Sequence, residues 1–308
     1  MPQIGPLNAV KLGLLIFRYL RQTKWGNMNN LLTYLNERFP LPVTGTHALF
    51  TAMFLVAVAQ PLGKSSNDYL STLFIAISFL FFMLRMRVTD EFKDASHDNS
   101  NYPNRPVQRG IITKKQLVTI GVISLVIELS SVAAAGLFQS NLNSALLYLA
   151  ILGFSVLTGF EFFIAGYLEK QFNLYFVLHQ AIFLLYPIWV LNVFGTEVSS
   201  SVLVAATVFV LFMASMEIMR KYELRYDPAG VLVMDTYLAV WGDGAFWLMF
   251  VISVCGPMAL FISFASIWLY VVTGIAGVLL LIFRKNNGAV RAIVAISFIS
   301  TSAVIFFS

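Results

Sequence analysis

Four carboxylates crowd into one short segment of a chain that is otherwise poor in charge. Asp90, Glu91, Asp94 and Asp98 follow directly after a strongly apolar stretch, whereas only 11% of the 308 residues are charged. If a helix continues through this segment, the three aspartates lie at successive i, i+4 steps and share one face. Carboxylates on one face repel each other unless cations neutralise them. Mg²⁺ with a phosphate-bearing substrate is the partner that hard oxygen ligands favour.

A second polar cluster, in the sequence EIMRKYELRYD, lies two thirds of the way along the chain. It combines Glu217 and Asp227 with Arg220 and Lys221. Carboxylates that hold a metal ion, together with cations that hold phosphate oxygens, are what a diphosphate site requires. A simpler interpretation stays open for each cluster. The first is then a solvated helix end kept soluble by neighbours such as Lys93, and the cations of the second merely mark the orientation of the chain in a membrane.

The rest of the sequence has the composition of an integral membrane protein. Hydrophobic residues make up 58% of it, and a membrane-spanning helix needs roughly 20 predominantly apolar residues. Continuous apolar blocks of about this length follow one another, and the pair Gly256-Pro257 splits one long block into two spans joined by a hairpin. We predict an all-α membrane fold of nine transmembrane helices, at approximately 46–61, 69–88, 116–137, 143–165, 172–193, 199–219, 238–255, 258–283 and 289–307.

The polar residues divide the chain into two parts. Residues 1–45 form an N-terminal cytoplasmic or interfacial segment, in which 5–25 has the pattern of an amphipathic helix lying at the membrane surface. Residues 46–308 form one membrane domain, because no polar stretch is long enough for a soluble domain.

Basic residues predict the orientation in the membrane. Lys and Arg fall in the N-terminal segment and in the loops after the second, fourth, sixth and eighth spans, whereas the opposite loops hold only Lys64. Cytoplasmic loops are enriched in these residues. The N-terminus is therefore predicted to be cytoplasmic and the C-terminus to lie on the opposite side. The excess of basic residues in the loops beside the lipid bilayer explains the net charge of +5, so no nucleic acid partner is needed to account for it.

The first cluster, its position and the span count resemble the UbiA superfamily of intramembrane prenyltransferases. Members of that family have nine transmembrane helices and an Asp-rich NDxxDxxxD motif after the second. DEFKDASHD has the spacing of this motif, with Asp90 in the Asn position, Glu91 in the neighbouring Asp position, and Asp94 and Asp98 in the remaining acidic positions. The downstream RPVQRG, which begins at Arg105, looks like the RPLxxGxxS-type continuation of these enzymes.

The second cluster departs from the family pattern, which has a DxxxD-type motif after the sixth helix. Glu217 stands in the first acidic position, but Lys221 lies where the next Asp is expected, and the following acid is Asp227. Either the cations take over part of the diphosphate charge, or Asp227 completes a looser second metal site. The segment GYLEKQF, with Lys170, is similar to the YxxxK-type phosphate-contacting segment of the family, although it is shorter by one residue.

The resemblance implies nine helices around a central cavity, with aromatic walls that stabilise an allylic cation. It also implies that Mg²⁺ is held by carboxylates and that cations clamp the diphosphate of an isoprenyl donor. The acids expected to be catalytic are Asp90, Asp94, Asp98 and Glu217. The implied metal ligands are Asp90, Glu91, Asp94, Asp98, Glu217 and Asp227, and the implied diphosphate contacts are Arg105, Lys170, Arg220 and Lys221.

Three ionisable residues, Glu128, Glu161 and His179, lie inside the predicted spans. Such groups are costly in a membrane and usually face the protein interior. Each either orients an acceptor or acts as a base, or is a hydrogen-bonded packing residue.

Three functions remain open. The first is an enzyme, a prenyltransferase that moves an isoprenyl group from its diphosphate to an aromatic or other lipophilic acceptor. The second is a terpene cyclase on the same scaffold. The third is a non-catalytic isoprenoid or lipid carrier. The complete first motif favours catalysis, whereas the altered second motif favours the cyclase or the carrier.

Overall fold

The computed structural model describes residues 28–60 and 68–308, and the predicted surface helix at 5–25 lies outside them. Within these residues the chain is helical, and its extended pairing is limited to one isolated bridge between Tyr226 and Leu232. The helices are α2 (Met28–Arg38), α3 (Leu41–Ala59), α4 (Tyr69–Lys93), α5 (Ala95–Asn101), α6 (Lys114–Phe138), α7 (Ser144–Gly159), η1 (Glu161–Phe163), α8 (Ala165–Leu168), α9 (Phe172–Gln180), η2 (Ala181–Leu184), α10 (Leu185–Phe194), α11 (Ser200–Arg220), α12 (Tyr237–Trp241), α13 (Asp243–Phe264), α14 (Trp268–Ile282) and α15 (Asn287–Phe307).

Seven helical segments are long and apolar enough to cross a membrane, namely α3, α4, α6, the run from α9 to α10, α11, α13 and α15. Two shorter apolar helices, α7 and α14, overlap the remaining predicted spans. The chain is therefore an all-helical, multi-pass membrane protein. The exact count of nine spans, the central cavity, the orientation of the termini and the two-part division of the chain stay predictions.

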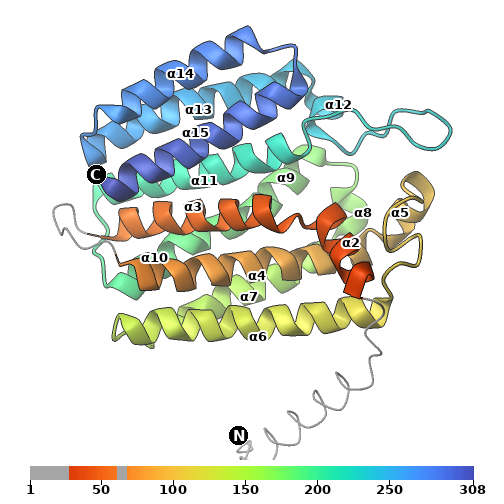
Figure 1. Cartoon of the computed structure of the whole chain (residues 1–308), viewed down its shortest axis with the longest axis horizontal. Helices are drawn as coiled ribbons and strands as arrows, with labels where there is room; N and C mark the ends of the chain where they lie inside the picture. The colour runs from red at the N-terminus through yellow and green to blue at the C-terminus, as the bar shows by residue number, and fades with distance from the viewer. Residues whose placement is uncertain (1–27, 61–67) are drawn as a thin grey trace, which may run out of the picture.

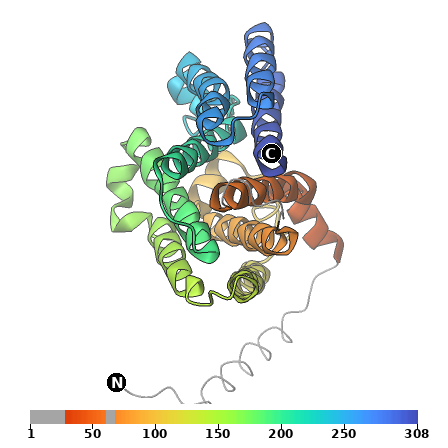
Figure 2. The same cartoon turned by 90° about the vertical axis from the view of Figure 1, so that its left-hand side faces the viewer.

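The helices lie alongside one another, so that both polar clusters come to the same end of the bundle. Figure 1 shows α2, α5, α8 and α12 gathered at this end, and the C-terminus at the other. Seen along the helices, α3 and α4 lie between α13 to α15 on one side and α6 and α7 on the other (Figure 2). α4 packs along both α3 and α6, and α11 packs along α13. We call the end that carries α5 and α12 the polar end.

The predicted hairpin at Gly256-Pro257 is wrong, because α13 continues through this pair and the chain turns only at Ala265, whose φ is 49°. A proline inside a helix frees the carbonyl four residues earlier. Here that carbonyl belongs to Ser253, and the hydroxyl of Ser297 in α15 donates to it at 3.4 Å. A neighbouring helix thus replaces the missing hydrogen bond, which is how membrane helices tolerate proline.

The fourth predicted span, 143–165, is also too long. α7 ends at Gly159, and the next turn, η1, has three consecutive non-glycine residues with positive φ: 48° at Glu161, 54° at Phe162 and 60° at Phe163. A continuous apolar run does not reveal such a turn. Phe163 is 74% exposed and stacks on Phe160, which is 61% exposed, so neither ring faces the interior of the bundle.

A buried ion pair joins α4 to α6 in the apolar part of the bundle. Arg85 donates to both carboxylate oxygens of Glu128, at 2.7 and 2.9 Å, and to the hydroxyl of Ser155 in α7. Tyr148 donates to the same carboxylate at 3.0 Å, and its oxygen lies 3.2 Å from the hydroxyl of Tyr186 in α10. Of the two roles open to Glu128, the structure shows the hydrogen-bonded packing residue, at the centre of contacts among α4, α6, α7 and α10.

We expect Glu128→Gln to destabilise the fold by about 3–5 kcal/mol, because it leaves the Arg85 guanidinium buried without a counter-charge. Thermal unfolding of the detergent-solubilised protein measures the loss. Glu37→Gln is the matched control, since Glu37 pairs with Arg109 at a site where both side chains are about 40% exposed, and such pairs contribute about 1 kcal/mol or less. Equal stability of the two variants would contradict the assigned role of the buried pair.

Candidate functional site

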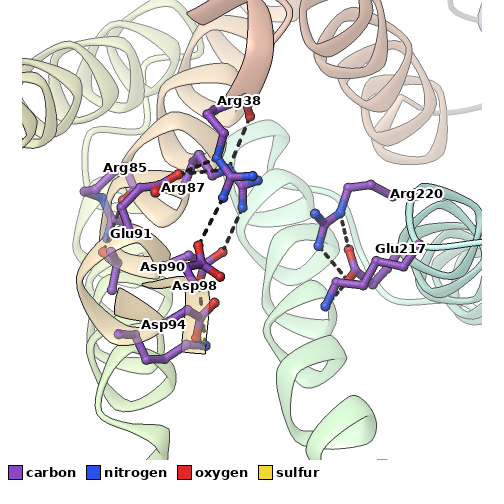
Figure 3. Close-up of polar contacts among 12 residues, drawn as sticks. Arg38, Arg85, Arg87, Asp90, Glu91, Asp94, Asp98, Glu217 and Arg220 are labelled. Atoms are coloured by element: carbon purple, nitrogen blue, oxygen red, sulfur yellow. Dashed lines mark hydrogen bonds and ion pairs between the residues drawn. The ribbon is translucent and has the colours of Figure 1, made fainter. Parts of the chain in front are cut away.

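The aspartates of the first cluster keep helical spacing across the junction of α4 and α5. α4 ends at Lys93 and α5 begins at Ala95, but the amide of Asp94 donates to the carbonyl of Asp90, and that of Asp98 to the carbonyl of Asp94, each at 2.8 Å. The three side chains therefore follow one another along the same side of the chain (Figure 3). We call Asp90, Asp94 and Asp98 the acidic face.

The acidic face is open at two positions and closed at the third. The side chains of Asp90 and Asp94 are 32% and 46% exposed, whereas that of Asp98 is 3% exposed. Asp98 forms an ion pair with Arg105 from the following loop, and Nη2 of Arg38 in α2 lies 3.8 Å from its other oxygen. The carboxylates with oxygens free for a ligand are thus those of Asp90 and Asp94.

Glu91 is directed toward α2 and is enclosed by cations. Its side chain is fully buried, Nε of Arg38 donates to it at 2.7 Å, and Nε of Arg87 lies 3.8 Å from the same oxygen. Arg87 also donates to the backbone carbonyl of Arg38 at 3.2 Å. The structure therefore uses Glu91 to attach α2 to α4, and its predicted role as a metal ligand stays a prediction.

The second cluster lies at the end of α11 and consists of one acid and two cations. Arg220 donates to both oxygens of Glu217 at 2.8 Å, and Nζ of Lys221 lies 3.6 Å from Glu217. The hydroxyl of Tyr237 in α12 donates to Glu217 at 3.4 Å, and the Lys221 ammonium lies 5.8 Å from the centre of the Tyr237 ring. One carboxylate thus supports two cations, and we call this group the cationic cluster.

The acidic face and the cationic cluster face each other across the space between α4 and α11 (Figure 3). Arg220 is 48% exposed, and it lies within electrostatic reach of Asp90. Burial raises the pKa of the Asp94 carboxyl, an effect that Lys93 and Lys221 oppose. Burial lowers the pKa of the Lys221 ammonium, and Asp90 is among the acids that oppose this. Each charged form is disfavoured until a counter-charge approaches.

Lys93 connects the acidic face to a third element. Its ammonium lies 3.5 Å from Asp90 and 4.0 Å from Asp94, and it donates to the hydroxyl of Tyr175 in α9 at 3.0 Å. It also lies 3.8 Å from the carboxylate of Glu161 in the left-handed turn η1. The turn that breaks the fourth span therefore delivers an acid to the site.

The acidic face fits a magnesium ion that binds together with a phosphate. Among the described residues, no group of three or more His, Cys, Asp and Glu is arranged to hold a metal ion. Mg²⁺ is usually held by one or two carboxylates plus waters and substrate phosphates rather than by a complete protein cage. Asp90 and Asp94 provide two such carboxylates, because their remaining contacts are ion pairs of 3.5 to 4.0 Å and not short hydrogen bonds.

Two predicted site residues lie apart from these groups. Lys170 is exposed beyond α8, and in the described part of the chain no ion pair joins it to either cluster. Asp227 accepts from the backbone amides of Ala229 and Val231, at 2.9 and 2.8 Å, and so closes the turn between α11 and α12. It lines a pocket of about 430 Å³ at the polar end, together with Arg38 and residues 101–106. Their predicted roles in phosphate and metal binding are not tested by this geometry.

Sequence reasoning missed Arg38, Arg87, Lys93 and Tyr175 as site residues. Arg87 and Lys93 had a usable signal, since each lies three residues from Asp90 on the same helix and neutralises it. Arg38 of α2 contacts Glu91, and Tyr175 of α9 contacts Lys93, across 53 and 82 residues of sequence. No spacing rule within one helix identifies such contacts.

Comparison with known proteins gives one structural likeness. Neither a protein-family model nor a curated protein matches the sequence. The fold is similar to a solved structure of digeranylgeranylglyceryl phosphate synthase. The two chains share 16% sequence identity with a TM-score of 0.49, and the match covers 89% of this chain and 99% of that chain. Likeness at this level does not assign side-chain roles.

We expect Arg38→Gln to release α2 from α4, because it removes the closest cation from the buried carboxylate of Glu91. Loss of one partner of a buried pair costs about 3 kcal/mol or more, which corresponds to on the order of a hundredfold faster amide exchange in Met28–Arg38. Hydrogen exchange with mass spectrometry measures it. Arg109→Gln, which breaks the exposed pair with Glu37, is the control. Unchanged exchange in Arg38→Gln would show that apolar packing alone holds α2.

Proposed function

We propose that this protein is a Mg²⁺-dependent membrane prenyltransferase that moves an isoprenyl group from its diphosphate to an aromatic or other lipophilic acceptor. One observation carries the proposal: half-exposed carboxylates oppose a cationic cluster at the polar end of an apolar bundle. The charges suit a diphosphate, and the bundle suits its hydrocarbon chain. The resemblance of DEFKDASHD to the first motif of the UbiA superfamily supports the same conclusion.

Different residues would bind the metal ion and the phosphate oxygens of the donor. Asp90 and Asp94 are the carboxylates with oxygens free to hold the metal ion, while Arg220 and Lys221 would bind phosphate oxygens from the other side of the space. Mg²⁺, when bound, neutralises the diphosphate and so favours its departure. Glu217 would orient the two cations rather than hold the metal, because its carboxylate already accepts from Arg220 at both oxygens.

The interior next to this end would receive the isoprenyl chain. Phe79, Phe82, Phe183 and Tyr186 have their ring centres 5.1 to 6.3 Å apart. Aromatic faces stabilise cations and carry no strong nucleophile. Such a lining would protect an allylic cation from water after the diphosphate departs.

We expect Asp90→Asn and Asp94→Asn each to lower the rate of diphosphate release by about 100-fold or more, because each removes charge that the metal and leaving group require. Release is measured with the purified full chain in lipid nanodiscs, with farnesyl or geranylgeranyl diphosphate, with and without Mg²⁺. Asp68→Asn is the control, since Asp68 caps the opposite end of α4 and Asn caps as well.

The products distinguish the three functions. Turnover only with an added acceptor supports transfer, whereas a hydrocarbon formed without acceptor establishes cyclisation. Absence of diphosphate release with every donor, in the natural protein as in the Asp94→Asn variant, would overturn both and favour the carrier.

Lys221 provides a second test, because it stands where an acid is expected. If its ammonium binds a phosphate oxygen, Lys221→Asp raises KM for the donor by about tenfold or more at any Mg²⁺ concentration, as the loss of a charged hydrogen bond of about 1.5–3 kcal/mol predicts. Lys115→Asp, on an exposed turn of α6, is the control. If Lys221→Asp instead raises the activity at high Mg²⁺, the position serves a second metal ion and the proposed contact is wrong.

A further inference from the structure

His179 in α9 has a buried nitrogen that no described residue satisfies. Its Nε2 atom has no hydrogen-bond partner in the described part of the chain, although the atom is inaccessible to solvent. The ring is fixed on two sides, by stacking on Tyr175 with ring centres 3.9 Å apart and by an edge contact with Phe162 at 6.2 Å. An unsatisfied buried acceptor costs about 1–3 kcal/mol.

The other nitrogen determines which tautomer is present. Nδ1 of His179 lies 2.8 Å from the backbone carbonyl oxygen of Tyr175. A carbonyl only accepts hydrogen bonds, so Nδ1 carries the hydrogen. In the neutral ring, Nε2 then carries a lone pair that can accept a proton. The backbone of α9 thus fixes the tautomer of the imidazole in which Nε2 is the basic nitrogen.

The position of His179 relates it to the acidic face. Tyr175 accepts a hydrogen bond from Lys93, which pairs with Asp90, and His179 follows Tyr175 by one helical turn of about 5.4 Å. α9 begins beside α12 at the polar end, where Trp241 donates to Asn173, and proceeds into the bundle. His179 therefore lies one turn deeper than the contact with Lys93. The first carbon of an isoprenyl group whose diphosphate occupies the acidic face would lie at this depth.

The groups around this ring from outside α9 come from three elements. Lys93 and Asp90 of α4 and Glu217 of α11 are within its electrostatic reach, and Phe162 comes from η1. The positive φ of Phe162 is unfavourable for a bulky residue, by about 1–2 kcal/mol, and persists only where surrounding contacts require it. The same strained turn places Glu161 against Lys93. The turn therefore contacts the Lys93–Tyr175–His179 group twice, through Glu161 on Lys93 and through Phe162 on His179.

We propose that His179 is the catalytic base that removes a proton from the acceptor. This inference rests on the proposed transferase function. The acceptor it implies carries a hydroxyl group, as a phenol or an alcohol does. The acceptor oxygen forms its bond to the first isoprenyl carbon after the bond from that carbon to the diphosphate oxygen has broken. Its electron pair leaves with the diphosphate. The hydroxyl proton passes to Nε2. After the product departs, the imidazolium gives that proton to the diphosphate or to water, which restores the neutral base. Atoms and charge balance without any oxidant or reductant.

His179→Gln tests the assignment, because the amide retains hydrogen bonding but cannot take the proton. The probes are geranylgeranyl diphosphate with Mg²⁺ as donor, and 4-propylphenol and 1-octanol as acceptors. Diphosphate release and prenylated probe are measured separately. We expect transfer to fall by about 100-fold or more, while diphosphate release falls by less than about tenfold and the isoprenyl group is recovered as the free alcohol or hydrocarbon. Added imidazole should restore transfer in His179→Ala.

His47→Gln is the matched control. His47 also has a buried Nε2 without a partner among the described residues, but its ring contacts Phe79 and Phe298, and no described charged group is within its electrostatic reach. It should transfer at the natural rate. Unchanged transfer in His179→Gln, or equal loss of transfer and release without rescue by imidazole, would overturn the assignment. Absence of diphosphate release in the natural protein would instead overturn the proposed function, and this assignment with it.

Discussion

Charge placed at the end of an apolar bundle has to be neutralised within the protein, and the architecture of the polar end depends on this constraint. An uncompensated buried carboxylate costs several kcal/mol. The acids that follow the second span draw their counter-charges from four separate elements: Arg38 of α2, Lys93 of α4, Arg105 of the loop after α5, and Arg220 of α11. The pairing fixes where these elements lie.

The four acids of the motif are neutralised to different degrees. Two of them hold neighbouring elements in place, and the other two keep capacity for a ligand. Glu91 and Asp98 are buried and paired at short range, so they attach α2 and the loop after α5 to α4. Asp90 and Asp94 keep solvent-exposed oxygens and only longer ion pairs. A carboxylate that already accepts a short hydrogen bond from a guanidinium has little capacity for a metal ion. The two loosely paired acids are the ones with capacity for a ligand.

The sequence predicted the helical class and the i, i+4 spacing of the acidic face, because hydropathy and helical periodicity are local properties. It failed where distant contacts override local preference. Gly256-Pro257 ends most helices, but Ser297 satisfies the freed carbonyl and α13 continues. The turn at 161–163 gives no sequence signal, since none of its residues is glycine. The contacts of Arg38 and Tyr175 depend on how helices pack, which spacing within one helix does not encode.

The role of Lys221 follows from the charges on the two sides of the space. Asp90 and Asp94 are balanced by Arg87 and Lys93, whereas Glu217 against Arg220 and Lys221 leaves +1. With an aspartate at 221 the second side would carry −1, and in the proposed function that side would need a metal ion of its own before a diphosphate could approach. Lys221 provides a positive charge where, in the proposed function, a second metal ion would act. One metal ion on the acidic face would then suffice to make the whole site attractive to an anion.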